Sequence, residues 1–313
     1  MKVTAEERTL TEQLSTDRLM EFTRNITRYV RLSGSPEERK AFRYIAEQLR
    51  GWGFEIEKHT AECWTSWPVS ASLEILGEPP QRIPCITHAM AASTPPEGIV
   101  LDLVDVGRGE DAALGRQSPR GQAAVCGGLA MPATVSQLER VGALAQIYVC
   151  GEQIHEMISS IVWGSPSPDT AWLLPKTPVV SVNREGGAKL YEAMRRSKGL
   201  RSPAERRARV RIRTRVDSRW RPLPQLIAHL RAPRGDGDFL LFSGHVDSWH
   251  YGAMDNGSAN ATQLEVARIM ANRRKLLRRD LRLAFWSGHS HSRYAGSAWY
   301  ADNFWQDLHD HCI

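Results

Sequence analysis

The fold is decided by residues 238–261, which read DFLLFSGHVDSWHYGAMDNGSANA. The apolar run Phe239–Phe242 has the length and composition of a buried strand. It leads into a polar loop that holds His245, Asp247 and Asp255, and a helix is expected to follow. Ligands of open α/β sheets collect at the carboxyl ends of strands, so this loop is the expected functional site.

The residue types in the loop are those of a metal centre. An imidazole nitrogen from His245 and a carboxylate from Asp255 are both good zinc ligands. Asp247 would then be the carboxylate that fixes the tautomer of the His245 ring. The ordered set, rather than any one of these residues, predicts a metal site.

This stretch resembles the M28 family of zinc aminopeptidases. In that family a strand ends in His-x-Asp-Ser and an Asp-Asn-Gly-Ser/Ala loop opens the next helix, as residues 245–248 and 255–258 do here. The resemblance implies that His245 binds one zinc ion, that Asp255 bridges two, and that Asp247 orients His245. It also implies a three-layer α/β/α domain with a mostly parallel mixed sheet. The implied activity is hydrolysis of peptide or amide bonds, typically removal of an N-terminal residue through a zinc-bound water.

Length and composition are those of a soluble protein with more than one domain, at 313 residues, 42% hydrophobic and 24% charged. No apolar run approaches the roughly 18 residues that span a bilayer, and the start of the chain has no apolar signal segment. The five cysteines are an odd number without a Cys-x-x-Cys spacing, which favours reduced thiols. We therefore predict a cytoplasmic protein that makes no membrane contact.

The net charge of +6 raises the question of nucleic-acid binding. Much of the basic excess lies between Arg195 and Arg221. Within that segment Val210 and Ile212 alternate with arginines, the pattern of a strand with one solvated face. We interpret the charge as a wet strand face and predict no nucleic-acid partner.

Three parts are expected along the chain. Residues 1–82 begin the peptidase domain, with a helix starting at Ser35-Pro36 and a strand from Phe54. Residues 83–200 carry short apolar runs between Gly/Pro-rich turns, which predicts a small β-rich unit. Its strands are expected at 98–106, 122–126, 143–149 and 177–182, and its helices at 132–141 and 185–196. This unit resembles the protease-associated (PA) domain inserted in some M28 enzymes, and residues 201–313 complete the domain core.

The segment after the strand at 281–286 departs from the family. The family has a Glu-Glu pair there, of which the first is the general base and the second a zinc ligand. Residues 286–297 read WSGHSHSRYAGS, without a carboxylate and one residue longer. Two registers are open, and because a serine hydroxyl is no base near neutral pH, we favour His291 as a metal ligand and His289 as the base.

The end of the chain is the second departure, because family members supply two more zinc ligands further on. Asp310 and His311 could stand in, but they follow a helix expected at 297–308 rather than a strand. We expect a truncated product, in which two zinc ions would bind only to the complete site. The sheet would have an open apolar edge able to pair with another chain, as in a homo-oligomer.

Three functions remain open from the sequence. The first is a metallo-aminopeptidase acting on peptides or small amides. The second is a catalytically silent relative that works as a binding protein, as in the transferrin receptor ectodomain, and loss of the Glu-Glu pair favours it. The third is a metal-dependent hydrolase of a non-peptide amide or carbamate. Retention of His245, Asp247 and Asp255 together favours a working metal site.

Overall fold

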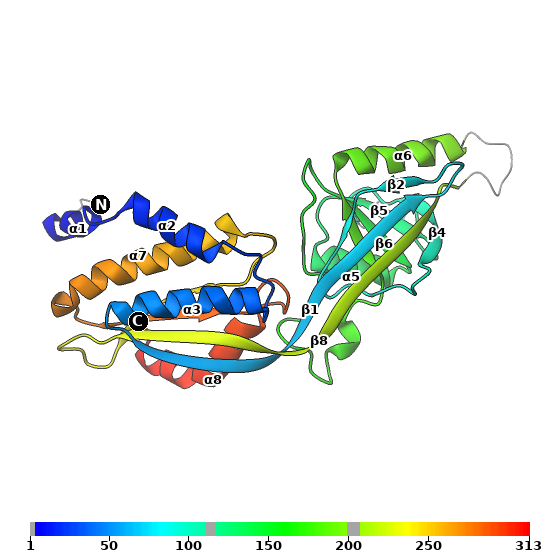
Figure 1. Cartoon of the computed structure of the whole chain (residues 1–313). Coiled ribbons are helices and arrows are strands. Elements are labelled where there is room, and N and C mark those ends of the chain that lie inside the picture. The colour runs from blue at the N-terminus through cyan, green and yellow to red at the C-terminus, as the bar shows by residue number, and fades with distance from the viewer. Residues whose placement is uncertain (1–3, 111–116, 199–206) are drawn as a thin grey trace. The chain divides into compact units, whose positions relative to one another are not determined.

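The computed structural model describes residues 4–110, 117–198 and 207–313. The chain forms two compact units, which are coloured along the sequence in Figure 1. The first unit is Met1–Thr65 with Trp220–Ile313, and the second is Ser66–Arg219. Each of the four hydrophobic clusters formed by described residues lies within one unit.

The sheet of the first unit carries the predicted site. Its strands lie in the order β1 (Glu55–Ile75), β8 (Arg209–Leu230), β10 (Asp280–Trp286) and β9 (Phe239–His245). β10 is antiparallel to β8 and parallel to β9, so the sheet is mixed, as predicted. The strands expected at 239–242 and 281–286 are confirmed.

Helices cover both faces of this sheet, which gives the three layers predicted (Figure 1). On one face lie α2 (Thr16–Ile26), α3 (Pro36–Gly51) and α7 (Ala259–Asn272), which bury Phe22, Ile45 and Leu264 in one cluster with β8 and β10. On the other face lies α8 (Ala295–His311), whose Tyr300 ring packs 4.8 Å from that of Trp286. The short helical segments α1 (Ala5–Thr11), η2 (Ala253–Ser258) and η3 (Arg274–Leu276) complete the unit.

The helix predicted at Ser35 begins as its sequence indicates. The Ser35 side chain accepts a hydrogen bond from the backbone N–H of Glu38, and Pro36 occupies the first turn. The apolar positions Phe42, Ile45, Ala46 and Leu49 are all buried. α3 therefore packs on the sheet by the apolar stripe expected of a 3.6-residue period.

The second unit is β-rich, and its described residues include two helices longer than one turn. β4 (Ile99–Asp105), β5 (Ala123–Gly127), β6 (Ala145–Val149) and β7 (Val179–Val182) pair in parallel, in that order. The other elements are β2 (Gln81–Ile83), β3 (Ile86–Thr87), α5 (Pro132–Arg140), η1 (Ala171–Leu173) and α6 (Arg184–Lys198). All four strands and both helices predicted here are confirmed, whereas the kinship with PA domains stays a prediction.

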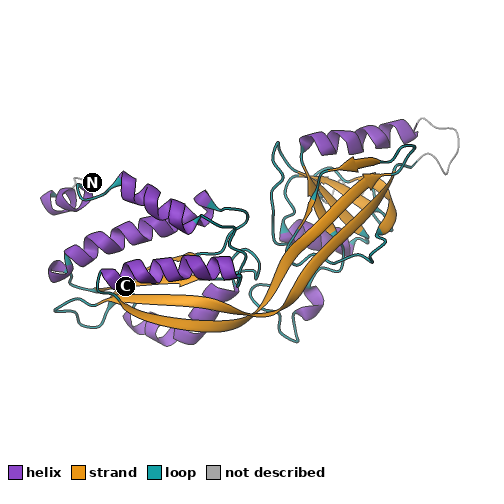
Figure 2. Cartoon of the chain, viewed as in Figure 1, coloured by secondary structure: helices purple, strands orange, loops and turns teal. Residues whose placement is uncertain are grey.

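The unit boundaries are wider than the predicted 83–200, because two long strands contribute to both units. β1 has 21 residues and β8 has 22, and they are neighbours in the sheet (Figure 2). Val210 and Ile212 on β8 are buried while Arg209 is exposed, which confirms the solvated strand face. None of the described helices combines the length and apolar character needed to cross a membrane.

Candidate metal centre

Two loops leave the same edge of the first unit's sheet. β9 ends at His245, which lies in register with Trp286 at the end of the parallel strand β10. The loop after β9 leads through η2, which holds Asp255, into α7. The loop after β10 carries His289 and His291. The loops that carry the candidate residues therefore both begin at the carboxyl ends of neighbouring parallel strands, as predicted.

His245 is held at both ring nitrogens. Nδ1 lies 2.9 Å from the backbone carbonyl oxygen of Asp247, and Nε2 lies 3.0 Å from Oδ1 of Asp255. A carbonyl oxygen and a carboxylate oxygen can only accept hydrogen bonds, so both ring nitrogens donate. The ring is consequently a cation in the metal-free site.

The pKa of His245 agrees with this assignment. Burial by itself would lower the pKa, but hydrogen bonds and charges from Asp247 and Asp255 outweigh it and raise the pKa to about 9. The proton on Nε2 is therefore retained at neutral pH. It lies between the two atoms that the sequence predicts as metal ligands.

Asp247 is fully buried beneath His245 and is surrounded by donors. Its Oδ2 accepts hydrogen bonds from the Ser33 hydroxyl at 2.7 Å and the Ser290 backbone N–H at 2.6 Å. Its Oδ1 accepts from the His289 backbone N–H at 3.3 Å and lies 3.5 Å from Nδ1 of His245. Burial would raise the pKa of this carboxyl, but His245 and these donors keep it well below its usual range. Asp247 thus links the loop after β10 to the loop after β9.

Asp255 is the solvent-facing member of the pair. Its side chain is 47% exposed, whereas that of His245 is 9% exposed. The hydrogen bond from His245 is the main cause of the lowered pKa of Asp255, which stays ionised. The pair therefore offers one buried nitrogen and one carboxylate that a ligand can reach from solvent.

His289 lies against His245. The two rings stack with their centroids 3.8 Å apart and their planes 7° apart. Burial, followed by the positive charge of His245, lowers the pKa of His289 to about 4, so the ring is neutral at neutral pH. The lone pairs of an imidazole lie in the ring plane, so two stacked parallel rings cannot aim at one ion together.

His291 has a different environment from the one predicted. The ring is fully buried, and its Nδ1 lies 3.4 Å from the backbone N–H of Ser33 and 3.3 Å from the Ser33 hydroxyl oxygen. Since a backbone N–H can only donate, Nδ1 is the acceptor and its lone pair is occupied. No group of three His, Cys, Asp or Glu side chains that could hold a metal occurs in 4–110, 117–198 and 207–313. The predicted trio of His245, Asp255 and His291 is therefore not assembled at one point.

His245 and Asp255 offer two ligand atoms whose spacing fits one zinc ion. In a tetrahedral zinc site the donor atoms lie about 3.4 Å apart, close to the 3.0 Å between His245 Nε2 and Asp255 Oδ1. Asp310 and His311, considered as substitute ligands, are exposed residues with other partners. Asp310 pairs with His309 at 2.9 Å, and His311 lies 3.6 Å from Asp238.

Three buried residues of the site were not predicted from sequence. Arg31, Ser33 and Glu38 lie more than two hundred residues before His245, in and after the turn between α2 and α3. Ser33 bridges Asp247 and His291, and the Glu38 carboxylate accepts from Ser287 at 2.9 Å. No spacing in the sequence links them to the loops that they contact.

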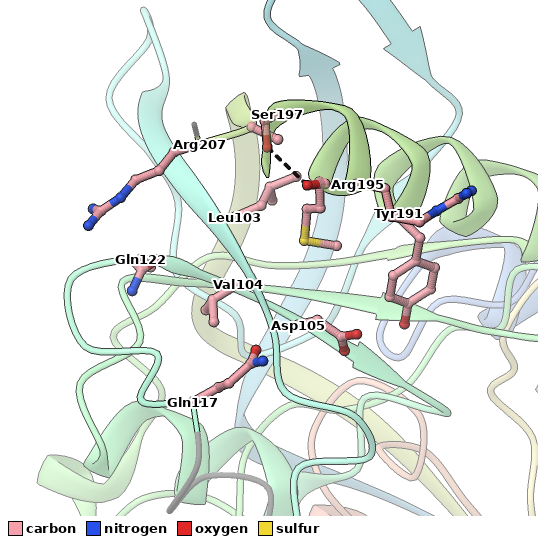
Figure 3. A pocket seen from close by; sticks show the side chains of 11 residues that line it. Leu103, Val104, Asp105, Gln117, Gln122, Tyr191, Arg195, Ser197 and Arg207 are labelled. Atoms are coloured by element: carbon pink, nitrogen blue, oxygen red, sulfur yellow. Dashed lines mark hydrogen bonds between the residues drawn. The ribbon is translucent and has the colours of Figure 1, made fainter. Parts of the chain in front are cut away.

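The second unit contains a separate cavity of about 460 Å³, shown in Figure 3. Leu103, Asp105, Tyr191 and Arg195 are among the residues that line it. Arg207, at its edge, is paired with Asp102 at 2.9 Å. None of the predicted site residues lines this cavity.

Comparison with known proteins identifies the segment that carries the loops. Residues 225–309 match the model of peptidase family M28. A segment of 78 residues is 32% identical to Probable glutamate carboxypeptidase VP8 of Zea mays. That match spans 24% of this chain and only 11% of the maize protein.

Solved structures with the same fold include two aminopeptidases and an M28 peptidase precursor. The precursor from Shewanella amazonensis SB2B has a TM-score of 0.78 at 16% identity, covering 97% of this chain and 71% of that one. The aminopeptidase from Aneurinibacillus sp. strain AM-1 has a TM-score of 0.69 at 20% identity, covering 98% and 70%. The zinc aminopeptidase from Bacillus subtilis has a TM-score of 0.67 at 17% identity, covering 91% and 64%. The chain therefore spans about two thirds of these structures.

Proposed function

We propose that this chain, whose residues 225–309 belong to peptidase family M28, hydrolyses peptide bonds with zinc held by His245 and Asp255. The observation that carries the proposal is the 3.0 Å distance between His245 Nε2 and Asp255 Oδ1, where Nε2 donates its proton to the carboxylate in the metal-free site. A cation that replaced this proton would meet one neutral nitrogen and one carboxylate oxygen. We further propose that cleavage removes N-terminal residues, since two of the similar structures are aminopeptidases.

Each residue of the site has a distinct task in this proposal. Bound zinc supplies Lewis-acid polarisation of the scissile carbonyl. Asp247 keeps the His245 ring in place through its backbone carbonyl at 2.9 Å, which leaves Nε2 as the ligating nitrogen. Asp255 holds the solvent-facing side of the site.

His289 is the group placed to accept a proton. Its ring is neutral at neutral pH because its pKa is lowered to about 4, and it lies against His245. Its buried Nδ1 has no hydrogen-bond partner among the residues that the structure describes. A neutral imidazole with an unused lone pair can take a proton, although a pKa near 4 makes it a weaker base than the family's glutamate.

A second candidate function is metal or peptide binding without catalysis. Two donors are fewer than the three protein ligands of a catalytic zinc site, and no carboxylate replaces the family's Glu-Glu pair. Both candidate functions use the His245–Asp255 pair, and they differ only in whether the bound peptide is cleaved.

Peptide cleavage distinguishes the two. The purified protein would be incubated with zinc and with matched peptides that differ only in a free or acetylated N-terminus, and the products identified by mass spectrometry. We expect stepwise loss of N-terminal residues from the free peptide, abolished in Asp255→Asn and retained in Asp310→Asn. Zinc binding without cleavage of either peptide would favour the binding function, and cleavage that ignores the acetyl group would contradict the aminopeptidase assignment.

A further inference from the structure

Arg31 is a fully buried cation that hydrogen-bonds to main-chain carbonyl oxygens. Its Nε donates to the carbonyl of Val246 at 2.7 Å, and its two terminal nitrogens donate to Tyr251 at 2.8 Å and Gly252 at 3.3 Å. A fourth hydrogen bond reaches the carbonyl of Tyr29 at 3.2 Å, in its own segment. The planar fork of a guanidinium is suited to several fixed acceptors at once.

Three of these four acceptors belong to the loop that separates the two proposed ligands. Residues 246–252 begin directly after His245 and end three residues before Asp255. The backbone of Arg31 binds the same loop, because its carbonyl accepts from the Ser248 N–H at 2.8 Å. The Ser248 hydroxyl in turn donates to the carbonyl of His250 at 2.9 Å. One residue from a distant part of the chain therefore contacts this loop at both ends and near its middle.

The loop has little room to rearrange around this contact. Gly252 has a φ of +50°, and a Cβ there would lie 2.4 Å from the Asp255 carbonyl oxygen and 3.1 Å from a terminal nitrogen of Arg31. Gly257, further along, donates its N–H to the Gly252 carbonyl at 2.9 Å. A shift of Gly252 would therefore also shift the turn that holds Asp255.

The charge of Arg31 is also matched to its surroundings. Burial lowers its pKa to about 10, which leaves it positive at neutral pH, and the negative charge of Asp247, followed by the carboxyl groups of Glu38 and Asp255, acts against that lowering. A buried cation without such compensation would be costly. Both the hydrogen-bond geometry and the nearby carboxyl groups therefore favour an arginine at position 31.

We infer that Arg31 is a positioning residue, which holds loop 246–252 and so sets the distance between His245 Nε2 and Asp255 Oδ1. This inference rests on the proposed function, because the distance matters for zinc only if the pair binds it. Lysine keeps the positive charge but cannot place three donors on Val246, Tyr251 and Gly252 together. We therefore expect that lysine cannot replace Arg31.

The test compares Arg31→Lys and Arg31→Met with Arg28→Gln, a change at a nearby exposed arginine. Zinc affinity would be measured by competition with a chromophoric chelator, and backbone hydrogen–deuterium exchange by mass spectrometry in the zinc-free proteins. We expect both Arg31 variants to lose at least tenfold in zinc affinity. We also expect faster exchange confined to residues 246–257, with β10 and α3 exchanging as in the wild type.

Two outcomes would overturn the inference. One is exchange in residues 246–257 that equals that of Arg28→Gln, and the other is full zinc affinity in Arg31→Lys. If Arg31→Met does not fold, the lysine variant, which keeps the charge, still decides. If the wild type binds no zinc, the proposed function fails, and the exchange measurement alone decides whether Arg31 holds the loop.

Discussion

Among the single residues, His245 is central to the site, because its protonated ring bonds to both Asp247 and Asp255. Both ring nitrogens face acceptors, Asp247 O at 2.9 Å and Asp255 Oδ1 at 3.0 Å, so the metal-free ring is held as a cation. Burial and the positive charge of His245, on which the His289 ring stacks, lower the pKa of His289 to about 4 and keep this second imidazole neutral. The site thus holds one positive charge at the point where zinc would place two.

Stability of the metal-free protein is predicted to depend on this proton. The folded pKa of His245, about 9, lies above the unfolded value of about 6.5, so its contribution is fully present below pH 6.5 and is lost as pH rises to 9. We expect the free energy of unfolding to fall by up to about 3 kcal/mol over this range, because one pKa unit corresponds to about 1.4 kcal/mol. Urea unfolding of chelator-treated protein at several pH values measures it.

The matched variants are His245→Gln, which should lack this pH-dependent loss, and His309→Gln, at an exposed histidine, which should keep it. Equal slopes in the two variants between pH 6.5 and 9 would show that His245 carries no shifted proton.

Asp247 is predicted to be the most sensitive carboxylate of the site. In Asp247→Asn the amide would point a donor at one of the N–H or O–H groups that the carboxylate now accepts, and the charge facing His245 would be lost. We expect a loss of about 3 kcal/mol in the free energy of unfolding at pH 7. Since the folded pKa of Asp247 is depressed, the difference should shrink as pH falls below about 4.

The control is Asp310→Asn at an exposed carboxylate, expected to change stability by less than about 0.5 kcal/mol. Urea unfolding measures the stability of both variants. An Asp247→Asn protein as stable as this control would show that the Asp247 carboxylate does not stabilise the fold.

The sequence allows residues to be placed near one another where they follow neighbouring strands. His245, Asp255 and His289 come together because parallel β9 and β10 end at the same edge. The environment of His291 could not be predicted, because the acceptor role of its Nδ1 depends on Ser33, which is distant in sequence. The side chain of Arg31 donates its four hydrogen bonds to main-chain carbonyl oxygens, and such contacts leave no pattern of residue types in the sequence.

At the scale of elements, the turn η2 is set by its close approach to α2. A Cβ at Gly257 would lie 2.2 Å from Cγ2 of Thr27, just after α2, and 3.0 Å from the Gly252 carbonyl oxygen. Only glycine allows this approach, so the Asp-Asn-Gly-Ser sequence has a packing reason as well as a chemical one. The separation of η2 from α2 therefore influences where Asp255 lies.

Gly257→Ala is predicted to displace η2 and weaken the site. We expect a loss of about 1–3 kcal/mol in the free energy of unfolding from overpacking, together with lower zinc affinity. Gly51→Ala is the matched control, because nothing lies within 4 Å of a Cβ there and Gly51 is the last residue of α3. It should leave zinc affinity unchanged and be neutral or slightly stabilising. Thermal melts and chelator competition measure both, and equal zinc affinity in the two variants would contradict the packing argument.

Element positions were largely predictable, but strand lengths were not. Alternation and apolar runs located every strand from β4 to β7, together with β9 and β10. The full lengths of β1 and β8 could not be predicted, because Pro68 in β1 and Pro222 and Pro224 in β8 remove backbone donors and argue against a continuous strand. For the same reason, the second unit spans Ser66–Arg219 instead of the predicted 83–200.

At the scale of the whole molecule, the site and its core belong to one unit. His245, Asp247, Asp255, Arg31 and Glu38 all lie within residues 1–65 and 220–313. The cluster that packs α2, α3 and α7 on the sheet also draws only on these residues. We infer that the first unit folds without the second.

A protein that joins Thr65 to Trp220 through a short Gly-Ser linker tests this. The ends are close, because Arg221 donates a hydrogen bond to the Thr65 carbonyl at 2.8 Å. We expect cooperative unfolding by circular dichroism and zinc binding within about threefold of the full chain. A linked protein that lacks cooperative unfolding would show that the second unit is required for the fold of the first.

The number of zinc ions bound per chain decides whether His245 and Asp255 form a metal site. The full chain, Asp255→Ala and the surface control Asp310→Ala would be dialysed against zinc, freed of loosely bound metal and analysed for zinc per chain. We expect at least one tightly held ion in the full chain and in Asp310→Ala, and its loss in Asp255→Ala. Zinc absent from all three proteins, or retained in Asp255→Ala, would contradict a metal site at His245 and Asp255.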